Sequence, residues 1–329
     1  MQKLGRCLGN SLGNSLGAVL RAPLRTSVGD SLRSRVRDYA AIPAVEIPEG
    51  RWLVLPRRGR TWLTELPGPP GAPALVLLHA VGCTGMLTWF PAVHELAKHY
   101  RVVVFDQRWH GRGIISEHFS LHDCADDVAA VITELELDRP IVAGYSMGSV
   151  IAQRVWRQHP DVVGGLVLAA TTDHFRTNGR EQIFHSGMEL SMGSLRALSK
   201  SRTVRWASRS TVEALDMGPT DIGQWALNEW RSTSPWAVAQ AVAAVGRHHS
   251  TPWLSRIDVP TAVLIPKRDW VIPAERQRQL AARIPGATVH EADCGHSGCV
   301  MESEKFVPTF LEAVQVTASR VQDRGRLDA

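Results

Sequence analysis

The 329-residue sequence has none of the segments that mark several large classes of protein. No apolar run approaches the roughly 20 residues of a membrane-spanning helix, so we expect a soluble, cytoplasmic protein. No apolar strand is followed by a G-x-G-x-x-G loop, which argues against a dinucleotide cofactor. The His, Cys and acidic residues do not cluster at ligand spacing, so the sequence implies neither a metal nor any other cofactor.

Cysteine is also scarce, with five residues in the whole chain. They are an odd number, and they lack the paired C-x-x-C spacing of a metal site. In a chain of this length, such thiols indicate a reduced protein of the cytoplasm. Cys294 and Cys299 flank His296, but we interpret them as small buried side chains.

An excess of positive charge is present only near the N-terminal end. Residues 1–40 contain seven Lys or Arg and two Asp, so this segment accounts for the whole formal charge of +5. A nucleic-acid-binding domain would carry its basic residues on the folded body, and we therefore expect no nucleic-acid partner. The repeat LGNSLGNSLG in this segment is rich in poor helix formers. We interpret residues 1–45 as a basic arm, poorly ordered or docking; a transit-like or membrane-surface peptide is the alternative.

Short apolar runs alternate with helical segments from about residue 52 onward. A pair of runs around the Arg-Arg-Gly-Arg of residues 57–60 predicts a hairpin. Later runs are continuously apolar, as strands buried on both faces must be. This alternation predicts an α/β fold with a doubly wound, mostly parallel sheet of about eight strands. The predicted strands are Trp52–Leu55, Thr61–Leu66, Ala74–Leu78, Arg101–Phe105, Pro140–Ala143, Gly165–Ala169, Thr261–Ile265 and Ala287–Glu291; the predicted helices are Met86–His99, Cys124–Leu137, Met147–His159, Ala274–Ile284 and Glu302–Val316.

The alternation stops between residues 173 and 256. This stretch is long, carries no strong strand signal and is rich in Trp and Met. We interpret it as a helical cap inserted into a core made of residues 46–172 and 257–329. Most of its large apolar side chains then form the core of the cap, and a few line an apolar pocket.

The sequence GYSMG at residues 144–148 lies between a predicted strand and a predicted helix. G-x-S-x-G in this context is typical of a nucleophile elbow, a strained turn that presents a serine hydroxyl. Serine is a weak nucleophile unless a neighbouring base takes its proton. Asp269 and His296 follow two late strands in the order acid then histidine, where the carboxyl ends of the strands deliver them to one crevice. We therefore predict Ser146 as the nucleophile, His296 as the base and Asp269 as the acid.

Taken together, these motifs resemble those of the α/β-hydrolase family over roughly residues 50–316. The resemblance implies an oxyanion hole formed by the backbone N–H groups of Val81 and Met147. The chain departs from the family pattern at Ala80, Ser149 and Pro266, where glycine is common, which affects loop geometry but removes no catalytic group. The matching segments are His79-Ala80-Val81-Gly82, Asp106 to Gly113, the elbow, the Asp269 loop and Gly295-His296.

Several other residues compete for these roles. Asp173 follows an earlier strand and is the rival acid, but the Asp269 loop also matches the D-x-x-x-P pattern of the family. We interpret His79 and His110, in motif loops, as structural, and we treat Asp106 and Arg108 in the same way. His248 and His249 are expected on the surface of the cap region.

The predicted activity is the hydrolysis of a small-molecule carboxylic ester, with a lipophilic or medium-chain acyl group. A carbon–carbon bond hydrolase, a thioesterase or amidase, and a cofactor-free haloperoxidase or perhydrolase share the same constellation. Dehalogenases and epoxide hydrolases are disfavoured, because the relatives that catalyse those reactions carry Asp at the elbow. A ligand receptor with slow hydrolysis is the alternative from another class.

Overall fold

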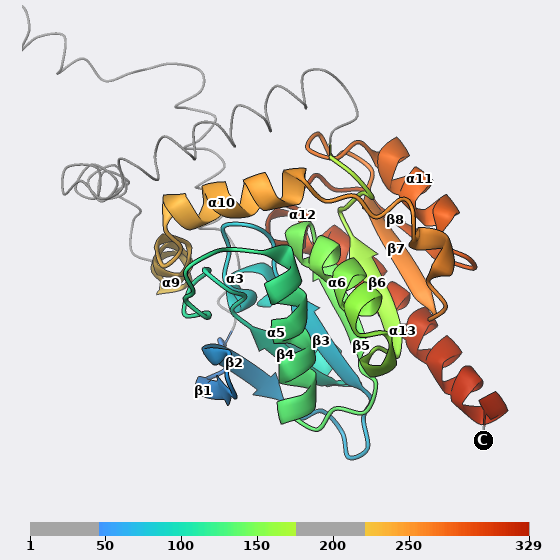
Figure 1. Ribbon diagram of the computed structural model, residues 1–329, viewed down its shortest axis with the longest axis horizontal. Helices are drawn as coiled ribbons and strands as arrows, with labels where there is room; N and C mark the ends of the chain where they lie inside the picture. Colours follow the sequence, from blue (N-terminus) through green and yellow to red (C-terminus); the bar gives the residue numbers. More distant parts are fainter. Residues whose placement is uncertain (1–45, 176–220, 329) are drawn as a thin grey trace, which may run out of the picture. The chain divides into compact units, whose positions relative to one another are not determined.

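A computed structural model describes residues 46–175 and 221–328 of the chain. Its centre is an eight-stranded sheet with the order β1-β2-β4-β3-β5-β6-β7-β8 (Figure 1). The β1–β2 and β2–β4 pairs are antiparallel, and every other pair is parallel. The predicted sheet is thus confirmed. Its strands are β1 (Gly50–Leu55), β2 (Gly59–Leu66), β3 (Ala74–Leu78), β4 (Arg101–Phe105), β5 (Ile141–Tyr145), β6 (Gly165–Ala169), β7 (Thr261–Pro266) and β8 (Thr288–Ala292).

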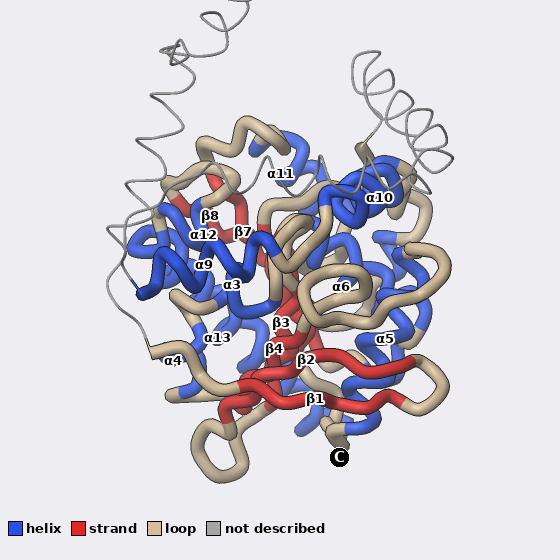
Figure 2. The backbone as a smooth tube through the Cα atoms, turned by 90° about the vertical axis from the view of Figure 1, so that its left-hand side faces the viewer, coloured by secondary structure: helices blue, strands red, loops and turns tan. Residues whose placement is uncertain are grey.

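Helices cover both faces of this sheet. Figure 2 shows α5 and α6 on one side and α13 on the other, and every residue of β5, β6 and β7 is buried between these layers. This is why those strands are apolar at nearly every position. The helices are α3 (Gly85–Trp89), α4 (Val93–Ala97), α5 (Leu121–Glu134), α6 (Met147–Gln158), α9 (Asp221–Arg231), α10 (Pro235–Gly246), α11 (Ala274–Arg283), α12 (Gly298–Met301) and α13 (Ser303–Asp328), with short 3-10 turns at Pro160–Val162 and Leu254–Arg256.

Three predicted helices differ from the structure. The helix predicted over Cys124–Leu137 forms as α5, three residues earlier at each end, because Ser120 caps its first turn. The single helix predicted over Met86–His99 is wrong, because the chain forms α3 and α4 with Pro91 between them. Proline lacks the N–H that would continue the helix, and α3 ends just before it. The last helix extends to Asp328, well beyond the predicted Val316. Thr317 and Val321 of this extension face Gly165 at the start of β6, so packing against the sheet prolongs α13.

The chain between β6 and β7 contains α9 and α10, which lie in the segment predicted as a cap. Two polar contacts join α9 to the sheet loops, since Glu229 accepts hydrogen bonds from Thr84 Oγ1 at 2.5 Å and from Arg112 at 3.0 Å. The backbone N–H of Gly111 also donates to Thr233 Oγ1 at 2.9 Å. Residues 176–220 of the predicted cap, and residues 1–45 of the predicted arm, lie outside the described residues. No described helix has the length and apolar character needed to cross a membrane.

Candidate active site

Ser146 occupies the sharp turn between β5 and α6. Its backbone has φ 53° and ψ −114°, a strained conformation for a residue with a side chain. The flanking glycines make the turn possible. A Cβ on Gly144 would lie 2.2 Å from the carbonyl carbon of Gly148, and one on Gly148 would lie 2.2 Å from the carbonyl oxygen of Leu78. The local geometry is therefore that of the predicted nucleophile elbow.

Ser149, where the family often has glycine, braces the elbow with its hydroxyl. It is fully buried, and its Oγ lies 2.6 Å from the Gly144 carbonyl oxygen and 2.8 Å from that of Ala169. The same Oγ accepts the Ala169 N–H at 2.9 Å. This departure from the family pattern thus ties the elbow to the end of β6.

The structure brings Ser146, His296 and Asp269 into one hydrogen-bonded chain. His296 Nε2 lies 3.2 Å from Ser146 Oγ, and His296 Nδ1 lies 2.7 Å from Asp269 Oδ2. A carboxylate can only accept, so Nδ1 carries the proton and Nε2 presents its lone pair to the serine hydroxyl. This arrangement can remove the hydroxyl proton and stabilise the imidazolium that results.

Asp269 is held by donors on both carboxylate oxygens. Oδ1 accepts the backbone N–H groups of Val271 and Ile272, each at 2.8 Å. Oδ2 accepts from His296 and also from Gln277 Nε2 at 3.1 Å. Gln277 is fully buried on α11, and its amide also donates to the carbonyl oxygen of Ile272 at 2.8 Å. Sequence analysis missed this residue, because a single Gln on an amphipathic helix carries no signal of its partner.

The two predicted oxyanion donors lie on the segments that meet at the elbow. Met147 is the first residue of α6, and Val81 is in the turn after β3, which the close approach of Gly148 to Leu78 and His79 brings beside the elbow. Among the described residues, neither N–H has a hydrogen-bond partner. The first N–H groups of a helix lack partners within the helix and favour negative charge.

The rival acid Asp173 is engaged elsewhere. It is buried, its Oδ1 lies 2.9 Å from His174 Nδ1, and its Oδ2 accepts from Thr251 at 2.5 Å and lies 3.1 Å from Arg283. Within the described residues it forms no bond to His296. The structure therefore pairs the predicted base with Asp269 and not with Asp173.

The prediction for His248 was wrong. The side chain is 2% exposed and packs edge-on against Trp253, while the neighbouring His249 is exposed as expected. Burial lowers the pKa of His248 to about 3, so it is neutral at physiological pH. It lies with Gln153 and Ser250 in a buried polar cluster beside Asp173.

Polar residues of the other motif loops brace the turns around the elbow. His79 donates from Nδ1 to the Ala80 carbonyl at 2.8 Å and accepts the Gln107 N–H at Nε2. Burial lowers the pKa of His79 to about 4, and that of His110 to about 3. Asp106 accepts the N–H groups of Gly85 and Arg112, and Arg108 forms a buried bidentate pair with Asp127. None of these contacts involves Ser146 or His296.

Three thiols near the site, Cys83 and Cys294 on loops and Cys299 in α12, are poor nucleophiles. Burial raises the pKa of Cys83 to about 11 and that of Cys294 to about 12, and it raises the pKa of Cys299 well above its ordinary value. The reactive form of cysteine is the thiolate, which these values exclude at neutral pH. Ser146 is thus the better nucleophile of this region. In the described part of the chain, no group of His, Cys, Asp and Glu could hold a metal ion.

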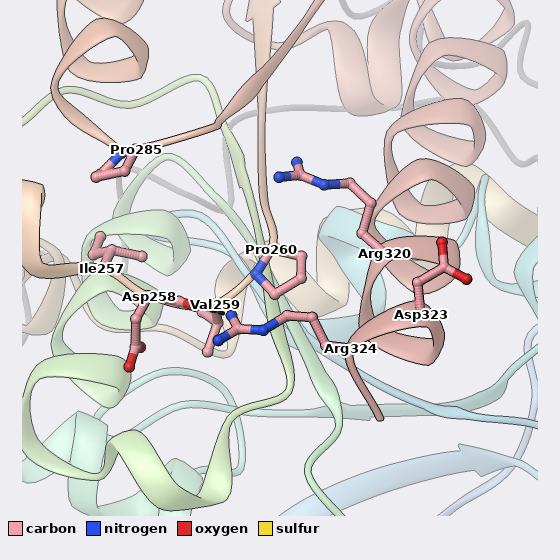
Figure 3. Close-up of a pocket in the computed structure, with 8 residues that line it drawn as sticks. All are labelled: Ile257, Asp258, Val259, Pro260, Pro285, Arg320, Asp323 and Arg324. Carbon is pink, nitrogen blue, oxygen red and sulfur yellow. Dashed lines mark hydrogen bonds between the residues drawn. The ribbon is translucent and has the colours of Figure 1, made fainter. Parts of the chain in front are cut away.

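A separate groove of about 340 Å³ lies away from these residues (Figure 3). Pro260, which lines it, precedes the first residue of β7, whereas Asp269 follows the last. The groove is therefore at the opposite end of the sheet. Its lining contains no serine, cysteine or histidine: it consists of Ile257, Asp258, Val259, Pro260, Pro285, Arg320, Asp323 and Arg324.

Comparison with known proteins identifies the family of the chain. A 3-oxoadipate enol-lactonase of Acinetobacter baylyi is 24% identical over 258 residues, covering 78% of this chain and 94% of that protein. A Serratia proteamaculans protein named as a carbamate hydrolase is 27% identical over 246 residues, covering 72% and 89%. The crystal structure of a Pseudomonas aeruginosa hydrolase superposes with a TM-score of 0.65 at 22% identity, covering 82% of this chain and 99% of that one. The profile of the alpha/beta hydrolase fold family matches residues 73–302. The chain therefore belongs to the α/β-hydrolase fold family.

Proposed function

We propose that this hydrolase cleaves a carboxylic ester by acyl transfer, with Ser146 as nucleophile, His296 as general base and Asp269 as the acid that orients it. The observation that carries the proposal is the chain of contacts from Asp269 to His296 at 2.7 Å and on to Ser146 at 3.2 Å. It ends at a serine in a strained turn, where a hydroxyl has little structural use.

The proposed reaction follows from this geometry. His296 Nε2 takes the proton of Ser146 Oγ as that oxygen bonds to the ester carbonyl carbon. The N–H groups of Val81 and Met147 hold the resulting oxyanion, an interaction worth roughly 3–4 kcal/mol for one such donor. The C–O bond to the alcohol then breaks, and the alcohol leaves with the proton from His296. Water attacks the acyl-enzyme by the same route and releases the acid.

An ester substrate is supported by two features. The Acinetobacter relative is named as a lactonase, and a lactone is a cyclic ester. We assign residues 173–256 to a cap that binds the acyl group, because α9 and α10 present apolar residues towards the site loops. Trp225 packs edge-on against Phe90 at 5.3 Å, and Val238 lies against Gly82, next to the proposed oxyanion donor. These contacts favour a lipophilic acyl group.

The closest alternatives use the same three residues on another bond. The Serratia relative is named for carbamate hydrolysis, and thioesters, amides or carbon–carbon bonds place a carbonyl in the same position. These reactions share the acyl-enzyme or its oxyanion, so substrate panels distinguish them. A receptor with slow hydrolysis would give one turnover and then stop.

The test is hydrolysis of p-nitrophenyl esters of graded acyl length. Wild type and Ser146→Ala are compared with Ser319→Ala, which removes the hydroxyl of an exposed serine on α13. We expect steady turnover in wild type and Ser319→Ala and its loss in Ser146→Ala. Folded wild-type protein without Ser146-dependent turnover on any ester would contradict the proposal.

A further inference from the structure

Tyr145 lies between Gly144 and the nucleophile, but its side chain serves the histidine. Its hydroxyl donates a hydrogen bond of 2.6 Å to the backbone carbonyl oxygen of His296. The two residues are 151 positions apart, so this bond joins the elbow directly to the loop that carries the base. Tyr145 is 1% exposed, which means that water cannot replace the bond when it is lost.

The ring of Tyr145 is fixed by aromatic neighbours. Trp89 packs edge-on against it at 6.3 Å, and Phe306 does so at 5.3 Å. Phe310 stacks on Phe306 and lies 4.8 Å from Trp89, closing a cluster between α3 and α13. A side chain held in this way has little rotamer freedom left, so its hydroxyl is a fixed point for the His296 loop.

The other side of His296 is also anchored. The N–H of Gly295 donates to Glu302 Oε2 at 2.9 Å, and Glu302 in turn pairs with Arg268 on the Asp269 loop. The N–H of Gly295, the residue before His296, is thus held by Glu302, and the carbonyl of His296 is held by Tyr145. The Tyr145 contact is the one that comes from the same turn as Ser146.

We propose that Tyr145 is a positioning residue that sets His296 in register with Ser146, by bonding the His296 carbonyl from the turn that presents the nucleophile. The inference rests on the proposed function. Ser146 and Tyr145 share a backbone that the glycine frame fixes, so any shift of the elbow moves both contacts to His296 together. Without the hydroxyl, the His296 carbonyl loses its anchor on the elbow, and the 3.2 Å contact between His296 and Ser146 depends on the remaining contacts of the loop.

The test compares Tyr145→Phe with Tyr100→Phe. Tyr100 is also buried, but it lies at the amino end of β4, and its hydroxyl has no hydrogen-bond partner among the described residues. Both variants remove one hydroxyl from a buried tyrosine and keep the ring. Ester kinetics give kcat and KM, and the rate of Ser146 labelling by a small alkyl fluorophosphonate reports activation of the nucleophile without a bound acyl chain. Thermal unfolding gives the folded fraction for normalisation.

We expect Tyr145→Phe to lower kcat and the labelling rate about tenfold, with KM within about twofold, because a displaced base lowers the chemical step and not binding. Tyr100→Phe should match wild type. Equal values for the two variants, or a loss that merely follows the unfolded fraction, would overturn the inference while leaving the proposed function intact. Wild-type protein that takes no label, or Ser146→Ala with full turnover, would show that the proposed function itself has failed.

Discussion

Two buried aspartates follow neighbouring strands of this sheet, and both contact a histidine. Asp173, after β6, lies 2.9 Å from His174, and Asp269, after β7, lies 2.7 Å from His296. His296 continues to Ser146, whereas His174 packs edge-on against the ring of the exposed His249. An aspartate–histidine pair is therefore common to both regions, and only one of them leads to a candidate nucleophile.

The remaining partners explain the difference. Asp269 accepts backbone N–H groups and the amide of Gln277, which orient the carboxylate towards one imidazole. Asp173 contacts Thr251, which follows α10, and the partly exposed Arg283 at the end of α11. These two contacts connect the segment after α10 to α11. In the proposed function the first arrangement serves a reaction, and we expect the second to serve the attachment of neighbouring segments. The distance between carboxylate and imidazole is similar in the two clusters, so it alone would not distinguish their roles.

The largest expected difference is in activity. Asp269→Asn should lower kcat/KM by about 10³–10⁴-fold, because the amide stabilises the wrong tautomer of His296. Asp173→Asn, the matched change after β6, should stay within about threefold, since it touches no reacting group. Ester kinetics on both variants measure this. A larger loss in Asp173→Asn than in Asp269→Asn would reverse the assignment of the acid.

The Asp173 cluster should also contribute to stability. Asp173→Ala should lower the free energy of unfolding by about 2 kcal/mol, because the half-buried hydroxyl of Thr251 and the guanidinium of Arg283 lose their buried partner. Urea unfolding of Asp173→Ala and wild type measures the change. An unfolding free energy equal to that of wild type would show that the Asp173 cluster does not hold these segments together.

The contribution of Asp173 to the free energy of unfolding should depend on pH. Burial raises the pKa of Asp173, but the Thr251 hydroxyl, His174 and Arg283 lower it more, so the net pKa lies below its ordinary value. A carboxyl with a depressed pKa stabilises the fold above its unfolded pKa of about 3.9, and this stabilisation is lost as the pH falls through the folded value. The stability advantage of wild type over Asp173→Asn should thus be constant near neutral pH and shrink below about pH 4. An advantage that grows on acidification would contradict this.

A smaller effect is expected at Ser149, which joins the elbow to the strand that precedes Asp173. Ser149→Ala leaves the buried N–H of Ala169 without its acceptor and should lower the free energy of unfolding by about 1 kcal/mol. We expect kcat to change by less than about threefold, because the glycine frame still fixes the turn. Denaturant unfolding and ester kinetics check the two parts. A large loss of kcat without a loss of stability would mean that Ser149 controls the geometry of Ser146.

Local patterns in the sequence predicted the sheet and the candidate residues of the site. The buried strands are continuous apolar runs, so they were located to within one or two residues, and the elbow and the two late loops were located by their place after strands. Helix lengths were less accurate where Pro91 and the packing of α13 on β6 decided them.

Contacts between distant segments could not be predicted. The hydroxyl of Tyr145 bonds a residue 151 positions away, and Gln277 in α11 and Glu302 between α12 and α13 reach back to the loops of Asp269 and Gly295. The surroundings of all three in the sequence are unremarkable. His248 was expected on the surface of the cap region with His249, whereas the fold buries it beside Trp253. Such positions depend on packing between elements, which the spacing of apolar residues within one segment does not encode.

The most direct test of the central claim is to trap the acyl-enzyme. Wild-type protein is mixed with p-nitrophenyl butyrate, quenched in acid during turnover, digested and examined by mass spectrometry. We predict a butyryl group on the peptide that contains Ser146, and no such group in Ser146→Ala. Steady ester turnover with Ser146 unmodified, or with the acyl group on another residue, would contradict the account.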